Sequence, residues 1–278
     1  MAVTWEAATV TAVTLSGGNL AATNTGTTST SQGAHVAAAD GKTTNKSYFE
    51  CTVTTFTGGA GVGIGIGTTA ATYAGISTTS TLGNMCYLVG HTGTGTIWGD
   101  GGNSGYNLGR ALTTGDVICV AVDLINRRSW FRLGAAGNWN NTVGHDPTNG
   151  TGGAGGFVVP AGTIIPFVTF GSGLGGPVGV AGNIMTANFG ASAFVGAMPS
   201  GYVAWEPPPT TANITQALAE HWLTTSPDAR ITQVVAEHWA SVASGNLQAV
   251  VTQVLLEHWT SVAVVVPAAG GPMVAMIH

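Results

Sequence analysis

A strict two-residue alternation sets the strongest limit on the fold of this chain. In "YFECTVTTF" (48–56) an extended backbone places Phe49, Cys51 and Val53 on one face, with polar residues between them. "GVGIGIG" (61–67) alternates even more regularly, with apolar residues on one face and glycines on the other. No stretch of the N-terminal part repeats at the helical period. The pattern predicts an all-β fold built from short strands.

Further strand candidates indicate a two-sheet arrangement. "GDVICVAVDL" (115–124) is apolar on both faces, which is typical of a central strand, and "TIIPFVTF" and "IMTANFG" add two more. Roughly eight to twelve such runs fit a β-sandwich. The glycine face of 61–67 indicates that a chain segment or a ligand approaches closely, and close packing is the simpler explanation.

Charge and hydropathy exclude several classes of partner. Only 7% of the residues are charged, and the net charge is −5. The cations are scattered except for Arg127, Arg128 and Arg132, so no surface that tracks phosphates is expected and nucleic acid is not a predicted partner. The N-terminus shows no secretion signal, and the late apolar stretch is broken by Pro and Gly before it reaches the ~20 residues of a membrane span. We expect neither secretion nor membrane insertion.

The cysteines predict neither a disulfide framework nor a zinc site. Cys51, Cys86 and Cys119 are odd in number and too far apart for a zinc ribbon. Cys51 and Cys119 lie inside apolar strand candidates, where a thiol serves as a small buried hydrophobe.

The composition changes at "WEPPPTTAN" (205–213), where three consecutive prolines form a stiff spacer. We therefore divide the chain into a β-sandwich at 1–205, a Pro-rich linker at 206–213 and a repeat segment at 214–278.

The order of motifs in the first part resembles the SPRY domain, a β-sandwich interaction module. Its most specific stretch begins with Gly115 and Asp116 before an apolar strand, continues through Asp123 before a turn, and ends in an aromatic return strand and "GNW". The closing pattern is carried by Asn188, Phe189, Gly190, Pro199, Gly201 and Trp205. The full set of matching stretches is 13–26, 46–53, 61–67, 115–140 and 186–205.

The resemblance implies binding rather than catalysis, through loops at one end of the sandwich. High Gly and Thr content and the insertion "NTVGHDPTNGTGGAGG" (141–156) make the chain look like SPRY-like modules of tailed-phage virion proteins. The C-terminal repeats likewise resemble "VTQV…E" repeats of phage structural proteins. No cofactor is implied.

Catalytic alternatives find little support in the sequence. Glycan hydrolysis needs two carboxylates across a bond, whereas the resemblance makes Glu50, Asp116 and Asp123 sheet-face or turn residues. A Ser-His-Asp triad would have to use His35, His91 or His145, and no nucleophile elbow is present. We expect no enzyme activity, and a glycan depolymerase is the least favoured alternative.

One glycine-rich segment, 91–109, combines aromatic rings with side-chain amides and a carboxylate. Such groups suit carbohydrates or flat protein epitopes, although a solvated loop with a partly buried Trp is the simpler explanation. The candidate binding residues on this loop surface are Trp98, Asp100, Asn103, Tyr106 and Asn107.

Three near-copies, "ITQALAEHW" (214–222), "ITQVVAEHW" (231–239) and "VTQVLLEHW" (251–259), make up the repeat segment. Strand and helix templates fit almost equally, and Ile, Val, Thr and Trp enrichment favours strands. Adjacent Glu and His point in different directions in either template, so no metal site is expected. A repeat this short cannot bury its own apolar face. The residues predicted to drive assembly are Trp222, Trp239, Trp259, Ile214, Ile231 and Val251.

Together these features favour a non-enzymatic virion structural protein that assembles in the host cytoplasm. The expected partners are other virion proteins and the chain itself, as a homo-oligomer such as a trimer. A receptor-binding or glycan-binding protein that acts at the host surface is the alternative.

Overall fold

The computed structural model describes residues 2–27, 32–58, 62–69, 85–90, 94–99, 102–153, 158–170 and 180–206, with only the backbone of 85–90, 102 and 103. All of them belong to one compact unit, Ala2–Pro208. The linker beyond Glu206 and the whole repeat segment lie outside the described residues. The assembly residues Ile214, Ile231, Val251, Trp222, Trp239 and Trp259 therefore stay predictions, and so does the division into domains.

One sheet has seven strands in the order β1, β2, β12, β4, β9, β10, with β13 also paired to β4. Its pairs are antiparallel except β13 with β4, which is parallel. The strands are β1 (Val13–Ser16), β2 (Ala21–Asn24), β4 (Lys46–Thr55), β9 (Val117–Asp123), β10 (Arg128–Leu133), β12 (Ile184–Asn188) and β13 (Val203–Ala204).

The other sheet has six antiparallel strands in the order β3, β11, β5, β6, β7, β8. The strands are β3 (Gln32–His35), β5 (Val62–Thr68), β6 (Met85–Gly90), β7 (Thr96–Gly99), β8 (Gly102–Asn107) and β11 (Ile164–Phe170). The only helices among the described residues are 3-10 turns, η1 (Ala7–Thr9), η2 (Ala38–Asp40) and η3 (Trp139–Asn141).

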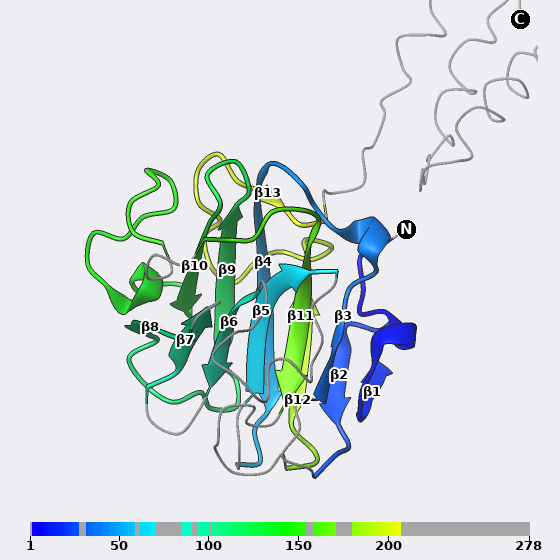
Figure 1. Ribbon diagram of the computed structural model, residues 1–278. Coiled ribbons are helices and arrows are strands. Elements are labelled where there is room, and N and C mark those ends of the chain that lie inside the picture. Colours follow the sequence, from blue (N-terminus) through cyan, green and yellow to red (C-terminus); the bar gives the residue numbers. More distant parts are fainter. Residues whose placement is uncertain are drawn as a thin grey trace, which may run out of the picture. The chain divides into compact units, whose positions relative to one another are not determined.

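The two sheets lie face to face and share one apolar core (Figure 1). Phe49 and Val120 contribute from the seven-stranded sheet, and Ile64 and Val168 contribute from the six-stranded sheet, all without solvent exposure. The all-β, two-sheet antiparallel sandwich predicted from the sequence is confirmed.

The predicted alternation is confirmed strand by strand. On β4, Phe49, Cys51 and Val53 enter the core between the sheets. On β5, Ile64 and Ile66 do the same, while the intervening glycines are buried on the opposite face. The glycine face is therefore enclosed rather than open to solvent.

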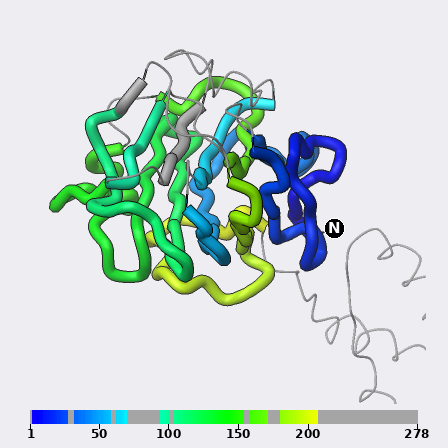
Figure 2. Tube along the Cα trace, turned by 90° about the horizontal axis from the view of Figure 1, so that it is seen from below, coloured from blue at the N-terminus to red at the C-terminus, as the bar shows by residue number. Residues whose placement is uncertain are grey.

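A second apolar cluster covers the outer face of the seven-stranded sheet. Strand β9 sends Cys119 and Ala121 to this face, where they meet Tyr48, Trp130 and Tyr202. The central strand is thus apolar on both faces, as predicted. Figure 2 shows the N-terminal strands at one side of the sandwich and the segment that contains β8, β9 and β10 at the other. There β8 and β10 are the end strands of their sheets, and η3 lies against both.

Candidate functional site

The segment expected to be a loop surface is largely a hairpin. Trp98 lies on β7, and Tyr106 and Asn107 end β8, so the expectation of a loop is wrong for these residues. Backbone hydrogen bonds between the two strands satisfy groups that a loop would expose to water. Asp100 lies outside the described residues, and Asn103 is described only as the cross-strand partner of Trp98.

The hairpin separates the predicted site residues into two groups. Ile97 is fully buried in the core between the sheets, so its neighbour Trp98 lies on the outer face of the six-stranded sheet. Tyr106 instead packs against the core and is half-buried. Trp98 and its cross-strand partner Asn103 therefore lie on a different face from Tyr106, while Asn107, the cross-strand partner of Thr96, ends the strand.

Tyr106 and Asn107 meet the insertion that follows η3, which the sequence had not placed near them. The rings of Tyr106 and His145 stand edge to face with centroids 5.0 Å apart. The Asn107 Oδ1 atom accepts hydrogen bonds from the Asn141 Nδ2 group at 3.1 Å and from the Gly109 backbone N–H at 2.7 Å. Val143, 87% exposed, lies between Asn141 and His145 in the sequence. These five residues, Tyr106, Asn107, Asn141, Val143 and His145, form the β8 edge surface.

Two glycines make room for this arrangement. A Cβ atom on Gly152 would lie 2.3 Å from the His145 ring, and one on Gly109 would lie 3.1 Å from the Asn141 side-chain amide. Both glycines have positive φ, +71° and +87°, which other residues rarely adopt. Gly152 in the insertion and Gly109 after β8 were the sequence signals that could have pointed to His145 and Asn141.

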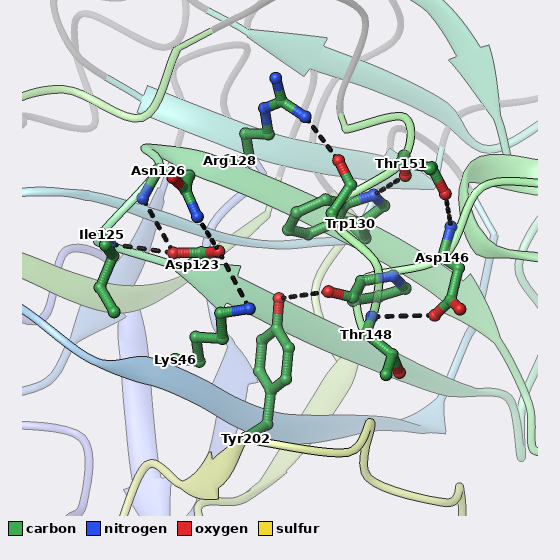
Figure 3. A network of polar contacts seen from close by, with 12 residues as sticks. Lys46, Asp123, Ile125, Asn126, Arg128, Trp130, Asp146, Thr148, Thr151 and Tyr202 are labelled. Atoms are coloured by element: carbon green, nitrogen blue, oxygen red, sulfur yellow. Dashed lines mark hydrogen bonds and ion pairs between the residues drawn. The ribbon is translucent and has the colours of Figure 1, made fainter.

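The insertion is held firmly on the outer face of the seven-stranded sheet (Figure 3). The Asp146 carboxylate accepts the Thr148 N–H and the Asn149 side-chain N–H, both at 2.8 Å, and so closes a tight turn. The Trp130 indole N–H donates to the Thr151 carbonyl at 2.9 Å, and Arg128 donates to the Gly150 carbonyl. Residues 141–153 thus form a fixed platform rather than a free loop.

Each of the three arginines of the basic cluster donates a hydrogen bond to a loop carbonyl. Arg127 donates to the Pro160 carbonyl at 2.7 Å, Arg128 to the Gly150 carbonyl, and Arg132 to the Ala197 carbonyl at 3.2 Å. Arg132 also lies over the Trp139 ring, 4.4 Å from its centroid.

Burial lowers the pKa of His145, so its imidazole is neutral at pH 7. The β8 edge surface therefore carries no formal charge.

On the outer face of the seven-stranded sheet, a row of residues from three neighbouring strands binds the segment that contains Val195, Gly196 and Ala197, the closing segment. Glu50 on β4 lies opposite Cys119 on β9, which lies opposite Arg132 on β10. The Glu50 carboxylate accepts the Val195 N–H at 2.8 Å, the Gly196 N–H at 2.7 Å and the Tyr48 hydroxyl at 2.6 Å.

Glu50 is buried, so its carboxylate has no room to act on a substrate. Burial raises the pKa of the Tyr48 hydroxyl and of the Cys119 thiol, and both therefore stay protonated donors toward Glu50. Gly196 fits here because it lacks a side chain: a Cβ atom would lie 2.7 Å from the Cys119 Sγ atom.

Two further carboxylates shape turns beside the strands. Asp116 forms a two-point ion pair with Arg110, at 2.6 and 2.7 Å. Asp123 accepts the backbone N–H groups of Ile125 and Asn126, both at 2.9 Å, and lies 3.5 Å from the Lys46 Nζ atom. The turn role that the resemblance implied for Asp116 and Asp123 agrees with these contacts.

Acid should weaken the sandwich partly through Asp123. Burial alone would raise the pKa of Asp123, but hydrogen bonds from Asn126 and Ile125 and the charge of Lys46 outweigh it and hold the pKa below its ordinary value. The stabilisation is therefore complete above the unfolded-state pKa of about 4 and is lost as the pH falls through the lower folded-state pKa. We expect Asp123→Asn to be less stable than the wild type at pH 7, with the two converging toward pH 2. Urea unfolding across this range checks it, and parallel pH curves would contradict it.

Neither a metal cluster nor a spanning helix is found in the described part of the chain. No three His, Cys, Asp or Glu side chains converge there, and no helix there is long and apolar enough to cross a membrane. Cys51 and Cys119 are free and buried, as predicted, while the Cys86 side chain lies outside the description.

No family model matches the chain, and no curated protein sequence matches it. Among solved structures, the chain is similar to the crystal structure of the SPRY domain of human HERC1. The sequence identity is 18%, the TM-score is 0.47, and the likeness covers 66% of this chain and 96% of that chain. It concerns the fold alone and says nothing about partners, a virion or the repeats.

Proposed function

We propose that the chain is a non-enzymatic bacteriophage virion protein that displays a SPRY-like binding module. The absence of catalysis in this proposal rests on one observation: the charged side chains are bonded within the fold. Glu50, Asp116 and Asp123 are bound by donors of the fold, and the clustered arginines bind carbonyl groups of three loops. What this leaves at the β8 edge is a neutral surface of aromatic, amide and apolar groups, which suits binding.

The virion assignment rests on the sequence resemblance. The combination of this sandwich, a Pro-rich linker and three near-copies of one repeat is the pattern associated above with phage structural proteins. A tail fibre, a collar or head fibre, and a capsid decoration protein all fit it. The repeats would assemble the chain with itself, for example as a trimer, or dock it to other virion proteins, without nucleic acid or membrane insertion.

Imaging of intact particles tests this proposal. An antibody or gold label against the chain should decorate particles at one repeated position, and dissociated particles should release the chain in a fixed ratio to other virion proteins. Absence of the chain from purified particles would reject the virion function.

The repeats provide a separate prediction. Trp239→Ala should dissociate or destabilise the assembly, because a fully buried Trp contributes ~3 kcal/mol or more. Sedimentation velocity and thermal melting of the full chain check it. An unchanged sedimentation coefficient together with an unchanged melting point would rule out a role of Trp239 in assembly.

Attachment to the host surface is the second candidate, and the β8 edge surface is the observation that favours it. Binding of the purified chain to host cells, in the absence of any attachment to particles, would support this function over a purely structural one. Release of reducing sugar from a host glycan would instead indicate a depolymerase.

A further inference from the structure

The hydrogen bonds of the β8 edge surface fix which way its two side-chain amides face. A backbone N–H can only donate, so the atom of Asn107 that faces Gly109 must be its oxygen. The same oxygen receives Asn141, so the atom of Asn141 that faces it must be the nitrogen. The orientation of both amides, often ambiguous, therefore follows from the network.

This network leaves one donor and one acceptor without a partner among the described residues. The Asn107 Nδ2 group and the Asn141 Oδ1 atom make no hydrogen bond there, and Asn107 is half-buried whereas Asn141 is exposed. Because the two amides are joined by a hydrogen bond of 3.1 Å, the free donor and the free acceptor belong to one linked pair of side chains. Part of the ordering that a ligand would otherwise impose is already present in this pair.

A donor beside an acceptor matches two adjacent hydroxyl groups of a sugar ring. A hydroxyl both donates and accepts, so one can accept from Asn107 Nδ2 while its neighbour donates to Asn141 Oδ1. The C–H groups of the same ring need an apolar contact. Val143, 87% exposed, and the half-buried Tyr106 ring are the apolar groups of this surface.

The charge of the surface selects among sugars. His145 is neutral at pH 7 because burial lowers its pKa, Arg110 is ion-paired with Asp116, and Arg128 donates to the Gly150 carbonyl. No cation is thus available to balance a uronic or sialic acid carboxylate, whose desolvation would be uncompensated.

We propose that the β8 edge surface binds a neutral hexopyranoside through two adjacent hydroxyl groups, held by Asn107 and Asn141. This inference rests on the proposed function as a binding module and names its ligand class. It also shifts the centre of the site from Trp98, on the outer face of the six-stranded sheet, to the junction of β8 and the insertion.

Saturation-transfer NMR on the full chain tests the inference with four probes: the methyl α-pyranosides of glucose, mannose, galactose and glucuronic acid. At least one neutral glycoside should receive saturation at its ring C–H protons, and the glucuronide should receive none. Binding of none of the neutral probes, or of the glucuronide alone, overturns the inference.

Asn141→Gly is the sharpest variant. Asn141 has φ +50°, a conformation that glycine adopts freely, so the change removes the side-chain amide without straining the backbone. Its affinity for the neutral glycoside should fall about tenfold, the effect of one or two lost hydrogen bonds. Asn45→Gly is the matched control, because Asn45 is an exposed asparagine with φ +83°, and it should bind as the wild type does.

Equal affinity of Asn141→Gly and the wild type overturns the inference, provided that their melting temperatures agree. The proposed function fails by a different result, the absence of the chain from particles. A chain found on particles that binds no neutral glycoside would refute only the sugar site.

Discussion

Glu50→Ala is expected to lower the free energy of unfolding by about 3 kcal/mol or more, because a buried donor left without an acceptor costs about 1–3 kcal/mol. The Val195 and Gly196 N–H groups both donate to this carboxylate, and the Tyr48 hydroxyl shares it. Without Glu50, the segment that contains Val195 and Gly196 loses two of its hydrogen bonds to the outer face of the sheet. Urea unfolding of the full chain, followed by circular dichroism, measures the loss.

Two further variants separate the hydrogen bonds from the bulk of the side chain. Glu50→Gln keeps one acceptor oxygen but turns an N–H donor toward one of the two backbone N–H groups, so it should cost less than alanine. Thr52→Ala, two residues along the same face of β4 and only half-buried, should cost least. The proposed role of Glu50 is wrong if its alanine variant is no less stable than Thr52→Ala.

The sequence predicts the faces of the strands well because strand periodicity is local. Phe49, Cys51 and Val53 could be assigned to the core from their spacing alone. The partner of Glu50 could not be assigned, because its donors Val195 and Gly196 lie about 145 residues away in the chain. No local pattern records such a contact.

The candidate site also depends on contacts between residues that are far apart in the chain. Trp98 and Tyr106 are close in the sequence and chemically alike, yet strand geometry places them on different surfaces. Asn141 and His145 lie in an insertion with no periodicity, and the platform that brings them to Tyr106 depends on long-range bonds to Trp130 and Tyr202. Residue chemistry therefore indicated the kind of surface, but not which residues compose it.

Trp205 is the second residue whose loss should have a large effect. Its side chain is fully buried, its ring centroid lies 5.6 Å from that of Phe49, and its indole N–H donates to the Asp40 carbonyl at 3.1 Å. Trp205→Ala should lower the free energy of unfolding by about 3–5 kcal/mol, the range for large aromatic residues removed from a core. Thermal and urea unfolding of the full chain measure it.

Trp98→Ala is the natural comparison, because it removes the same side chain from a partly exposed position of the same sandwich. Its cost should be clearly smaller, since less apolar area leaves contact with the protein. Trp205→Phe should fall between the two, because it keeps a ring against Phe49 but leaves the Asp40 carbonyl without its donor. Equal costs for the two alanine variants would contradict the larger contribution expected of the fully buried Trp205. The comparison also decides whether Trp98→Ala can serve in binding experiments, since only a variant that keeps the fold can report on a surface.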